Sequence, residues 1–262
     1  MCGRYVIIST VEEYEKKFQA TAKIPWQANY NVAAGQKAPV ITAEKPQEIQ
    51  AYYFGFTPSW SKKRTWVINA RSEGDHNKEN DPNFTGSKGI LKKPFFRKAI
   101  RSQRCLVLAD AFIEGTTKEK LQKPYLVYMR NKNRPFALAG IYDEWVNQES
   151  GEVFPTFAII TCPPNALLQK IPHHRMPVVV PEGQYRRYLN PETDLSEITA
   201  MLSPFPAKEM NAYPIDSAIS KVKTNQKEAL QPIGPPLMKE VGLQQKQRVE
   251  LFGMGENRKL KN

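Results

Sequence analysis

Short apolar runs, rather than long ones, dominate the pattern of this chain. The runs are rich in Val, Ile, Tyr and Phe and are bounded by turn residues, which is typical of strands. The pattern predicts strands over Gln47–Phe56, Cys105–Phe112, Tyr125–Met129, Phe136–Tyr142 and Phe154–Cys162.

Helical spacing is confined to a few short segments. Thr10 and Glu13 form the pattern of a capping box, and Tyr14 and Phe18 follow at helical spacing. A first helix is therefore expected over roughly residues 10–19. The same spacing predicts further helices over Pro94–Ser102, Pro163–Lys170, Glu182–Leu189 and Leu195–Leu202.

Many strands with few intervening helices indicate the α+β class. We expect a single compact domain around a mostly antiparallel, partly barrel-like sheet with short peripheral helices. The 262 residues are enough for one substantial core. The domain is expected to span residues 2–233, followed by a polar C-terminal tail over residues 234–262.

Several classes of protein are disfavoured. No run approaches the roughly 20 apolar residues of a membrane helix, and the N-terminus lacks the pattern of a signal peptide. The cysteines Cys2, Cys105 and Cys162 show no CxxC spacing, which argues against a disulfide scaffold and against a zinc ribbon. We expect a cytoplasmic monomer that associates with no membrane and needs neither a metal nor another cofactor.

Charge gives the first positive indication of function. Lys and Arg number 38 against 26 Asp and Glu, a net charge of +12. Residues 61–104 hold twelve basic and four acidic residues, and Trp60, Trp66, Phe95 and Phe96 lie in or next to them. Such a region suits a phosphate backbone with unstacked bases. A merely basic surface is the alternative.

Cys2 carries distinctive chemistry once Met1 is removed. Aminopeptidases remove Met1 before a small residue, and Cys2 would then hold a free α-amine and a thiol on adjacent carbons. Such an aminothiol condenses with an aldehyde to an imine and closes to a thiazolidine ring. About a tenth of an ordinary α-amine is unprotonated at pH 7, and an ordinary thiol needs only modest help to ionise. The alternative is an unreactive buried cysteine.

Seven sequence blocks, in order, carry a resemblance to a known family. They are Met1–Tyr5, Tyr30–Gly35, Phe54–Trp60, Ile68–Glu73, Arg104–Leu106 with Asp110–Glu114, Ala139–Tyr142, and Ile171–Pro177. Together they resemble the SOS response-associated peptidase (SRAP) family of abasic-site processing proteins, from residue 2 to about residue 233. Any one block is weak, whereas seven in order are specific.

The resemblance implies a covalent role in the DNA damage response. Cys2 would trap an abasic site in single-stranded DNA as a thiazolidine crosslink that shields the lesion and can be reversed. The family name implies an alternative, in which Cys2 is the nucleophile of a peptidase. In one version of this alternative, the peptidase only removes Met1 from the protein itself. A noncovalent nucleic-acid binder is the third hypothesis, and it predicts that Cys2→Ala leaves function intact.

Three further residues are candidates for the chemistry. Glu114 ends an apolar run, so burial should raise its pKa and suit it to proton transfer. The resemblance selects His173, rather than His174, to orient or protonate the sugar oxygen. Asn69 offers an amide to the sugar. The alternatives are an exposed Glu114 and a structural Asn69. The His pair alone forms no metal site.

Five residues are candidates for DNA binding. Arg4 and Arg71 can hold phosphate with both guanidinium arms. Trp60 and Trp66 can stack on bases beside the gap, although tryptophans also close core edges. Asn31, in the loop beside Cys2, is either structural or a DNA contact.

The chain also departs from the family pattern. Ala34 stands where the family usually has Pro, Ala111 where it has Gly, and Gly115 where it commonly has Trp, so a more open surrounding is expected for Glu114. Residues Lys221–Asn225 match a family segment only loosely.

One motif in the tail is left over. Residues Gln247–Phe252 have the Gln-x-aliphatic-x-Leu-Phe pattern of peptides that dock in bacterial sliding clamps. The alternative is that their apolar side chains pack back on the domain as a last strand.

Overall fold

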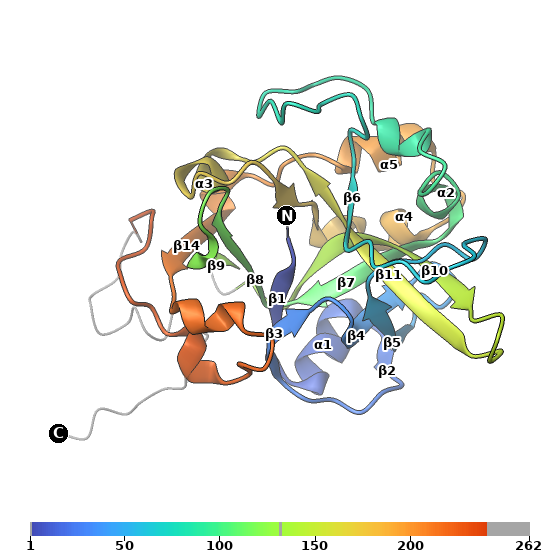
Figure 1. Cartoon of the computed structure of the whole chain (residues 1–262), viewed down its shortest axis with the longest axis horizontal. Helices are drawn as coiled ribbons and strands as arrows, with labels where there is room; N and C mark the ends of the chain where they lie inside the picture. Colours follow the sequence, from blue (N-terminus) through green and yellow to red (C-terminus); the bar gives the residue numbers. More distant parts are fainter. Residues whose placement is uncertain (1, 131–132, 240–262) are drawn as a thin grey trace.

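The computed structural model describes residues 2–130 and 133–239. Its strands form two sheets (Figure 1). Neighbouring strands of the five-stranded sheet are antiparallel throughout. Their order is β14 (Met210–Pro214), β9 (Lys120–Met129), β8 (Ala111–Thr116), β1 (Arg4–Ile7) and β3 (Asn29–Ala33).

The second sheet closes on itself. β11 pairs antiparallel with β10 and parallel with β5, so β11, β10, β7, β4 and β5 form a ring. The strands of this sheet are β12 (Met176–Pro177), β11 (Val153–Cys162), β10 (Phe136–Val146), β7 (Arg104–Ala109), β4 (Lys37–Thr42), β5 (Glu48–Phe54) and β2 (Thr21–Ala22), with β6 (Asn69–Arg71) on β11 and β13 (Val179–Val180) on β10. The predicted α+β class and partly barrel-like sheet are confirmed.

A buried carboxylate marks the corner between the sheets. Only Asp110 separates β7 from β8. Its side chain accepts hydrogen bonds from the backbone N–H groups of Ile8 and Ser9, at 2.6 and 2.9 Å, and from the Tyr14 hydroxyl at 2.7 Å. Because all three donors belong to the segment that follows β1, Asp110 fixes the direction in which the N-terminal strand leaves the sheet.

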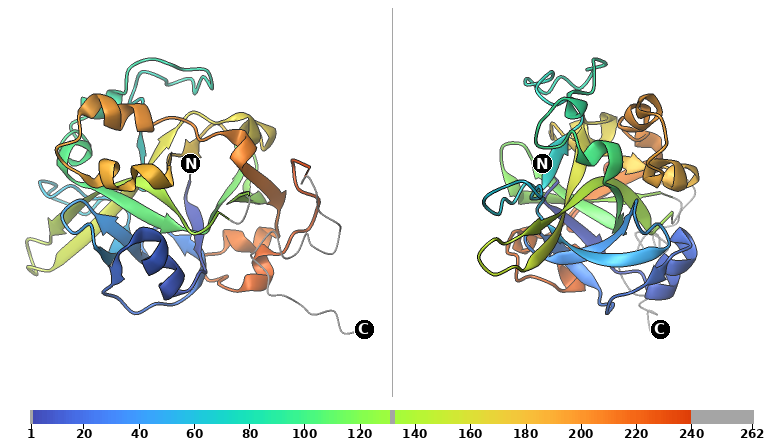
Figure 2. Two further views of the ribbon diagram at one scale, coloured as in Figure 1. Left: turned by 180° about the vertical axis from the view of Figure 1, so that it is seen from behind. Right: turned by 90° about the vertical axis from the view of Figure 1, so that its right-hand side faces the viewer.

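The helices are short and peripheral. Figure 2, from behind, shows α1, α4 and α5 in front of the sheets. The predicted first helix is confirmed as α1 (Val11–Phe18), with the capping box of Thr10 and Glu13 formed. The other helices are α2 (Ala99–Ser102), α3 (Ala166–Lys170), α4 (Tyr185–Leu189) and α5 (Leu195–Met201), and the 3₁₀ turns are η1 (Gly89–Leu91), η2 (Glu182–Gln184), η3 (Ala207–Glu209), η4 (Ser217–Ser220) and η5 (Lys227–Leu230).

Several boundaries differ from the prediction. The run Cys105–Phe112, predicted as one strand, is divided at Asp110 between β7 and β8. Of the helix expected over Pro94–Ser102, only the last four residues are α-helical, because turns occupy the part after Pro94. Residues after position 233 also contact the sheet, since the Leu237 N–H donates to the Ala212 carbonyl at 2.8 Å. The tail motif Gln247–Phe252 lies outside the described residues. No helix in the described part is long and apolar enough to cross a membrane.

Candidate active site

Four predicted residues meet where β1 begins. The Asn69 Nδ2 atom donates to the Cys2 carbonyl at 3.0 Å. His173 Nε2 lies 3.3 Å from Glu114 Oε2, and the Cys2 thiol is hydrogen-bonded to Glu114. Glu114 reaches Cys2 because β8 pairs directly with β1, with Arg4 opposite Ile113.

A cavity of about 430 Å³ opens beside this group. Glu114, His173 and Arg4 are part of its wall. The other lining residues are Gly3, Ile113, Gly115, Thr116, Thr117, Lys120, Leu121 and His174. The volume is within the range of small-ligand sites, so a sugar can approach the carboxyl group and the imidazole together.

Glu114 is a weak acid in this site. Burial raises its pKa to about 7, while its hydrogen bond from Cys2 acts in the opposite direction. The expectation of an open surrounding is wrong, because Glu114 is only 2% exposed. The reason is Gly115, which has no side chain and therefore lets the backbone of Lys120 close over the strand.

His173 is held in one tautomer. Its Nδ1 atom lies 2.7 Å from the Gly115 carbonyl oxygen, which only accepts, so Nδ1 carries the hydrogen. Burial lowers the His173 pKa to about 3, so the ring is neutral and its Nε2 lone pair faces Glu114. When Glu114 is protonated, the contact between the two is a hydrogen bond from its carboxyl group to the imidazole. Of the two roles predicted for His173, orienting or protonating the sugar oxygen, this low pKa favours the orienting role.

The Cys2 thiol needs more help than expected. Burial raises its pKa well above the usual value, and the charge of nearby Glu114 raises it further. The expectation that only modest help is required is wrong for this fold. A base must take the thiol proton as sulfur reacts, and the Glu114 carboxylate is in contact with it.

Asn69 orients Cys2 and keeps an acceptor available. Its Nδ2 atom donates to the carbonyls of Cys2 and Ile68, both at 3.0 Å. Its Oδ1 atom is buried and has no hydrogen-bond partner among the described residues. A donor brought by a ligand would satisfy this oxygen.

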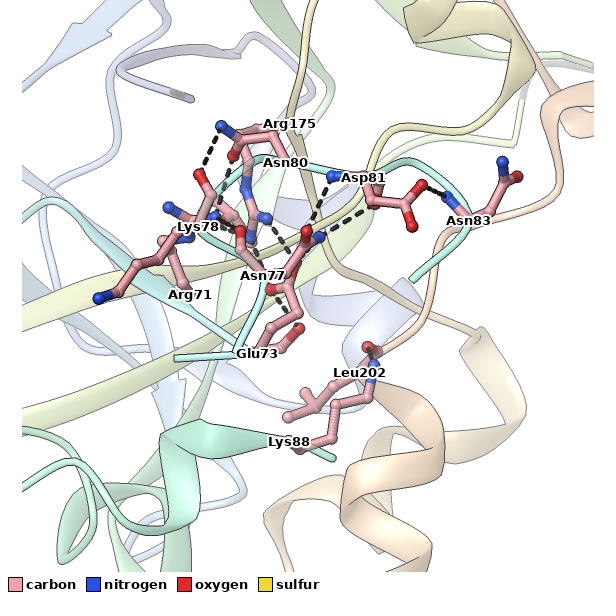
Figure 3. A network of polar contacts seen from close by, with 12 residues as sticks. Arg71, Glu73, Asn77, Lys78, Asn80, Asp81, Asn83, Lys88, Arg175 and Leu202 are labelled. Atoms are coloured by element: carbon pink, nitrogen blue, oxygen red, sulfur yellow. Dashed lines mark hydrogen bonds and ion pairs between the residues drawn. The ribbon is translucent and has the colours of Figure 1, made fainter. Parts of the chain in front are cut away.

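Both candidate arginines already donate hydrogen bonds to backbone carbonyl groups. Arg4 lines the cavity, and its Nη1 atom donates to the Gly3 carbonyl at 3.0 Å. Arg71 is drawn in Figure 3 against the loop that follows β6, where it donates to the Asn77 carbonyl and, at 2.9 Å, to Asn80 Oδ1. Arg71 therefore orders this loop.

The two candidate tryptophans are at the surface. Trp60 is 60% exposed and Trp66 is 49% exposed. The guanidinium of Arg64 lies 4.1 Å from the centre of the Trp66 ring. Trp66 also packs on Gly55, where a Cβ atom would come within 2.7 Å of the indole. Arg64 thus fixes the orientation of Trp66.

Asn31 has a structural position. Its side chain is fully buried, and Nδ2 donates to the carbonyls of Ile219, Lys221 and Thr224, each at 3.0 Å. In this conformation it presents no surface to DNA and instead holds the segment between η4 and η5.

A buried ion pair lies next to the site and was not predicted from the sequence. Arg175 binds Glu73 with both guanidinium arms, at 2.5 and 2.9 Å, and both side chains are buried (Figure 3). The pair joins the end of β6 to the loop that carries His173. Both residues lie in family-like blocks, and their opposite charges were the available signal.

Within the described residues, no group of three or more His, Cys, Asp or Glu side chains could hold a metal ion. Cys2, Cys105 and Cys162 are all free and buried.

Comparison with known proteins decides the family. Residues 1–222 match the family described as SOS response associated peptidase (SRAP). The chain belongs to the SRAP family. An abasic site processing protein of Bacillus subtilis, YoqW, is 30% identical to this SRAP chain over 240 residues, covering 88% of the chain and 99% of the relative.

Further relatives agree with this SRAP assignment. The abasic site processing protein YedK of Escherichia coli is 26% identical, over 89% of this chain and all of that protein. A crystal structure of a Bacteroides thetaiotaomicron protein superposes with a TM-score of 0.74 at 27% identity, covering 88% of this chain and 99% of that one. The family and the fold predicted from the sequence are therefore confirmed.

Proposed function

We propose that this SRAP protein forms a covalent thiazolidine crosslink between Cys2 and abasic sites in single-stranded DNA. One observation carries the proposal: the Cys2 thiol, a carboxyl group with a pKa of about 7 and a neutral imidazole are in contact beside a cavity. The names of the relatives, abasic site processing proteins, support the same substrate.

The chemistry begins at the amine. After Met1 is removed, the α-amine of Cys2 adds to the C1′ aldehyde of the open sugar and gives a carbinolamine. Protonated Glu114 gives its proton to the carbinolamine hydroxyl, which leaves as water, and an iminium forms. Because His173 holds the proton of Glu114 in place, the acid is oriented before the sugar arrives.

Ring closure returns the proton. The Cys2 sulfur bonds to the iminium carbon, and the thiol proton passes to the Glu114 carboxylate. The net reaction joins aldehyde and aminothiol with loss of one water, and Glu114 ends as it began. A carboxyl group with a pKa near 7 can perform both transfers at neutral pH.

DNA binding follows from charge and aromatic surface. The net charge of +12 favours a phosphate backbone. Arg4 and Arg71 are proposed to bind phosphates, and exposed Trp60 and Trp66 to stack on bases beside the site. Such a protein acts in DNA repair, in the cytoplasm with the DNA.

An intact-mass measurement tests the proposal. The protein lacking Met1 is incubated with a single-stranded oligonucleotide carrying one abasic site, and denaturing gels follow the product. We expect a heat-stable adduct whose mass is the sum of both partners less one water, with the modification on Cys2. Cys2→Ala should give none. Absence of an adduct on the first residue of the processed wild-type protein would contradict the proposal. Peptide cleavage stays a separate prediction, which a casein assay tests.

A further inference from the structure

The turn between β8 and β9 brings a second basic group to the cavity. Lys120 lines the same wall as Glu114 and Arg4, and its side chain is exposed. No ion pair involves it among the described residues. Glu119, the acid of this turn, pairs instead with Lys123 at 2.7 Å. Lys120 is therefore a cation without a protein counter-ion at the edge of the site.

Gly115 makes this placement possible. A Cβ atom at position 115 would lie 1.8 Å from the Lys120 carbonyl oxygen, so any other residue would push the turn away. The register of the β8–β9 ladder also shifts between Gly115 and Thr116. The bulge thus folds the turn against the strand that carries Glu114.

The backbone of Lys120 adds a second indication. Its φ angle is 54°, in the left-handed region that turns usually fill with glycine or asparagine. A lysine there costs stability. Strained backbone of this kind is concentrated at ligand-binding positions, and it therefore favours a Lys120 side chain that binds a ligand at the cavity.

The remaining wall of the cavity favours an anion. Glu114 is its only carboxyl group, and burial raises the pKa of that group to about 7. Arg4 and Lys120 supply positive charge, and the cavity volume of about 430 Å³ is within the range of small-ligand sites. The ligand chemistry that fits is a sugar together with one attached phosphate.

We propose that Lys120 and Arg4 form a phosphate subsite that binds one of the two phosphodiesters flanking the abasic sugar. This inference rests on the proposed function. It adds one element of specificity. The protein recognises the abasic sugar together with the DNA phosphate on one side of it, through Lys120 where the β8–β9 turn meets β9.

Salt dependence of binding tests the subsite. The probe is a single-stranded oligonucleotide with a tetrahydrofuran abasic analogue, which has no aldehyde and therefore reports binding alone. Each phosphate contact on a single strand contributes about 0.7 to the slope of log affinity against log salt. Lys120→Ala should lower that slope by about 0.7 and weaken binding at low salt up to about fivefold. Lys118→Ala, in the same exposed turn but outside the cavity wall, is the matched control and should leave the slope unchanged.

Two further experiments show which phosphate Lys120 contacts and whether the turn must hold the lysine in place. With a neutral methylphosphonate at one flanking position, the effect of Lys120→Ala should vanish for one of the two positions and persist for the other. Gly115→Ala keeps the lysine but displaces the turn, so it should lower the slope as Lys120→Ala does. Gly183→Ala is its control, since a Cβ atom there meets nothing within 4 Å.

The outcomes separate the two proposals. An unchanged slope in Lys120→Ala, or an equal loss in Lys118→Ala, overturns the subsite while the adduct assay on the wild-type protein still stands. Failure of the wild-type protein to form the adduct overturns the proposed function itself.

Discussion

Glu114 and His173 share one proton because of how each is surrounded. The Gly115 carbonyl fixes the hydrogen of the imidazole on Nδ1, which leaves Nε2 to accept from the carboxyl group. Burial then favours the neutral form of both groups, raising one pKa and lowering the other. The acid of the site is thus the carboxyl group, and the imidazole serves as its partner.

Replacing Glu114 should change the pH dependence of stability. Its folded pKa of about 7 lies above the ordinary 4.5, so its contribution to stability is fully present below pH 4.5 and is lost as pH rises through 7. Between pH 4 and pH 8 the wild-type protein should lose about 3 kcal/mol that Glu114→Gln retains. Urea unfolding of both proteins at the two pH values measures this. Parallel pH profiles of the two would show that the carboxyl group is not perturbed.

The same substitution should affect chemistry more than binding. Gln cannot donate and then accept a proton, so adduct formation should slow by about 10²–10⁴-fold, and the affinity for the tetrahydrofuran oligonucleotide should change little. Single-turnover adduct kinetics and binding titrations separate the two. Equal rates for Glu114→Gln and wild type would remove Glu114 from the proton transfers.

At the scale of elements, the site depends on segments that are far apart in sequence. β1 lies between β3 and β8, β6 joins β11 in parallel, and the Glu73–Arg175 pair ties β6 to the loop of His173. Breaking this pair would leave a buried charge unpaired, which is more damaging than losing both partners.

The segment between η4 and η5 depends on a single side chain. Asn31→Ala removes an amide whose two N–H groups are shared among three carbonyls, and it should cost about 2 kcal/mol of unfolding free energy, at about 1 kcal/mol for each N–H group. Urea unfolding measures the loss, and hydrogen exchange should show faster exchange over residues 219–224. Asn83→Ala, at an exposed position, should change stability by less than about 0.5 kcal/mol. A similarly small effect for Asn31→Ala would assign the segment to other contacts.

Local sequence patterns predicted the helices and strands that neighbouring residues determine. The capping box gave α1, and apolar runs gave the strands that became β5, β7, β9, β10 and β11. The sequence did not predict β3, because Asn-Tyr-Asn lacks an apolar run, nor the pairing of Thr156 with Tyr53 that closes the ring. Such pairings depend on the whole chain and leave no periodic signal.

The site was predictable only through the sequence blocks. Burial of Glu114 could be expected from its place after an apolar run, but its contact with His173 could not. The tautomer of His173 depends on the Gly115 carbonyl, a backbone group with no sequence signature. Asn31 shows the limit most clearly, since a loop asparagine can equally be exposed or, as here, enclosed by three carbonyls.

At the scale of the whole molecule, we expect that adduct formation and binding to a sliding clamp can be separated. Deleting residues 244–262 removes the sequence Gln247–Phe252 and none of the residues that form the site. Adduct formation by the purified protein should therefore be unchanged, while capture on an immobilised bacterial sliding clamp should be lost. Gln247→Ala, within the full-length chain, is the finer variant. Clamp capture that survives the deletion would contradict the docking prediction.

The position of β1 between two partners also limits how far Cys2 can travel. Arg4 is held in both ladders, opposite Ala33 of β3 and Ile113 of β8. Cys2 lies two residues before this fixed point, and two extended residues span at most about 7 Å. The tether is therefore too short to carry Cys2 out to a distant aldehyde, so the aldehyde has to be brought to Cys2.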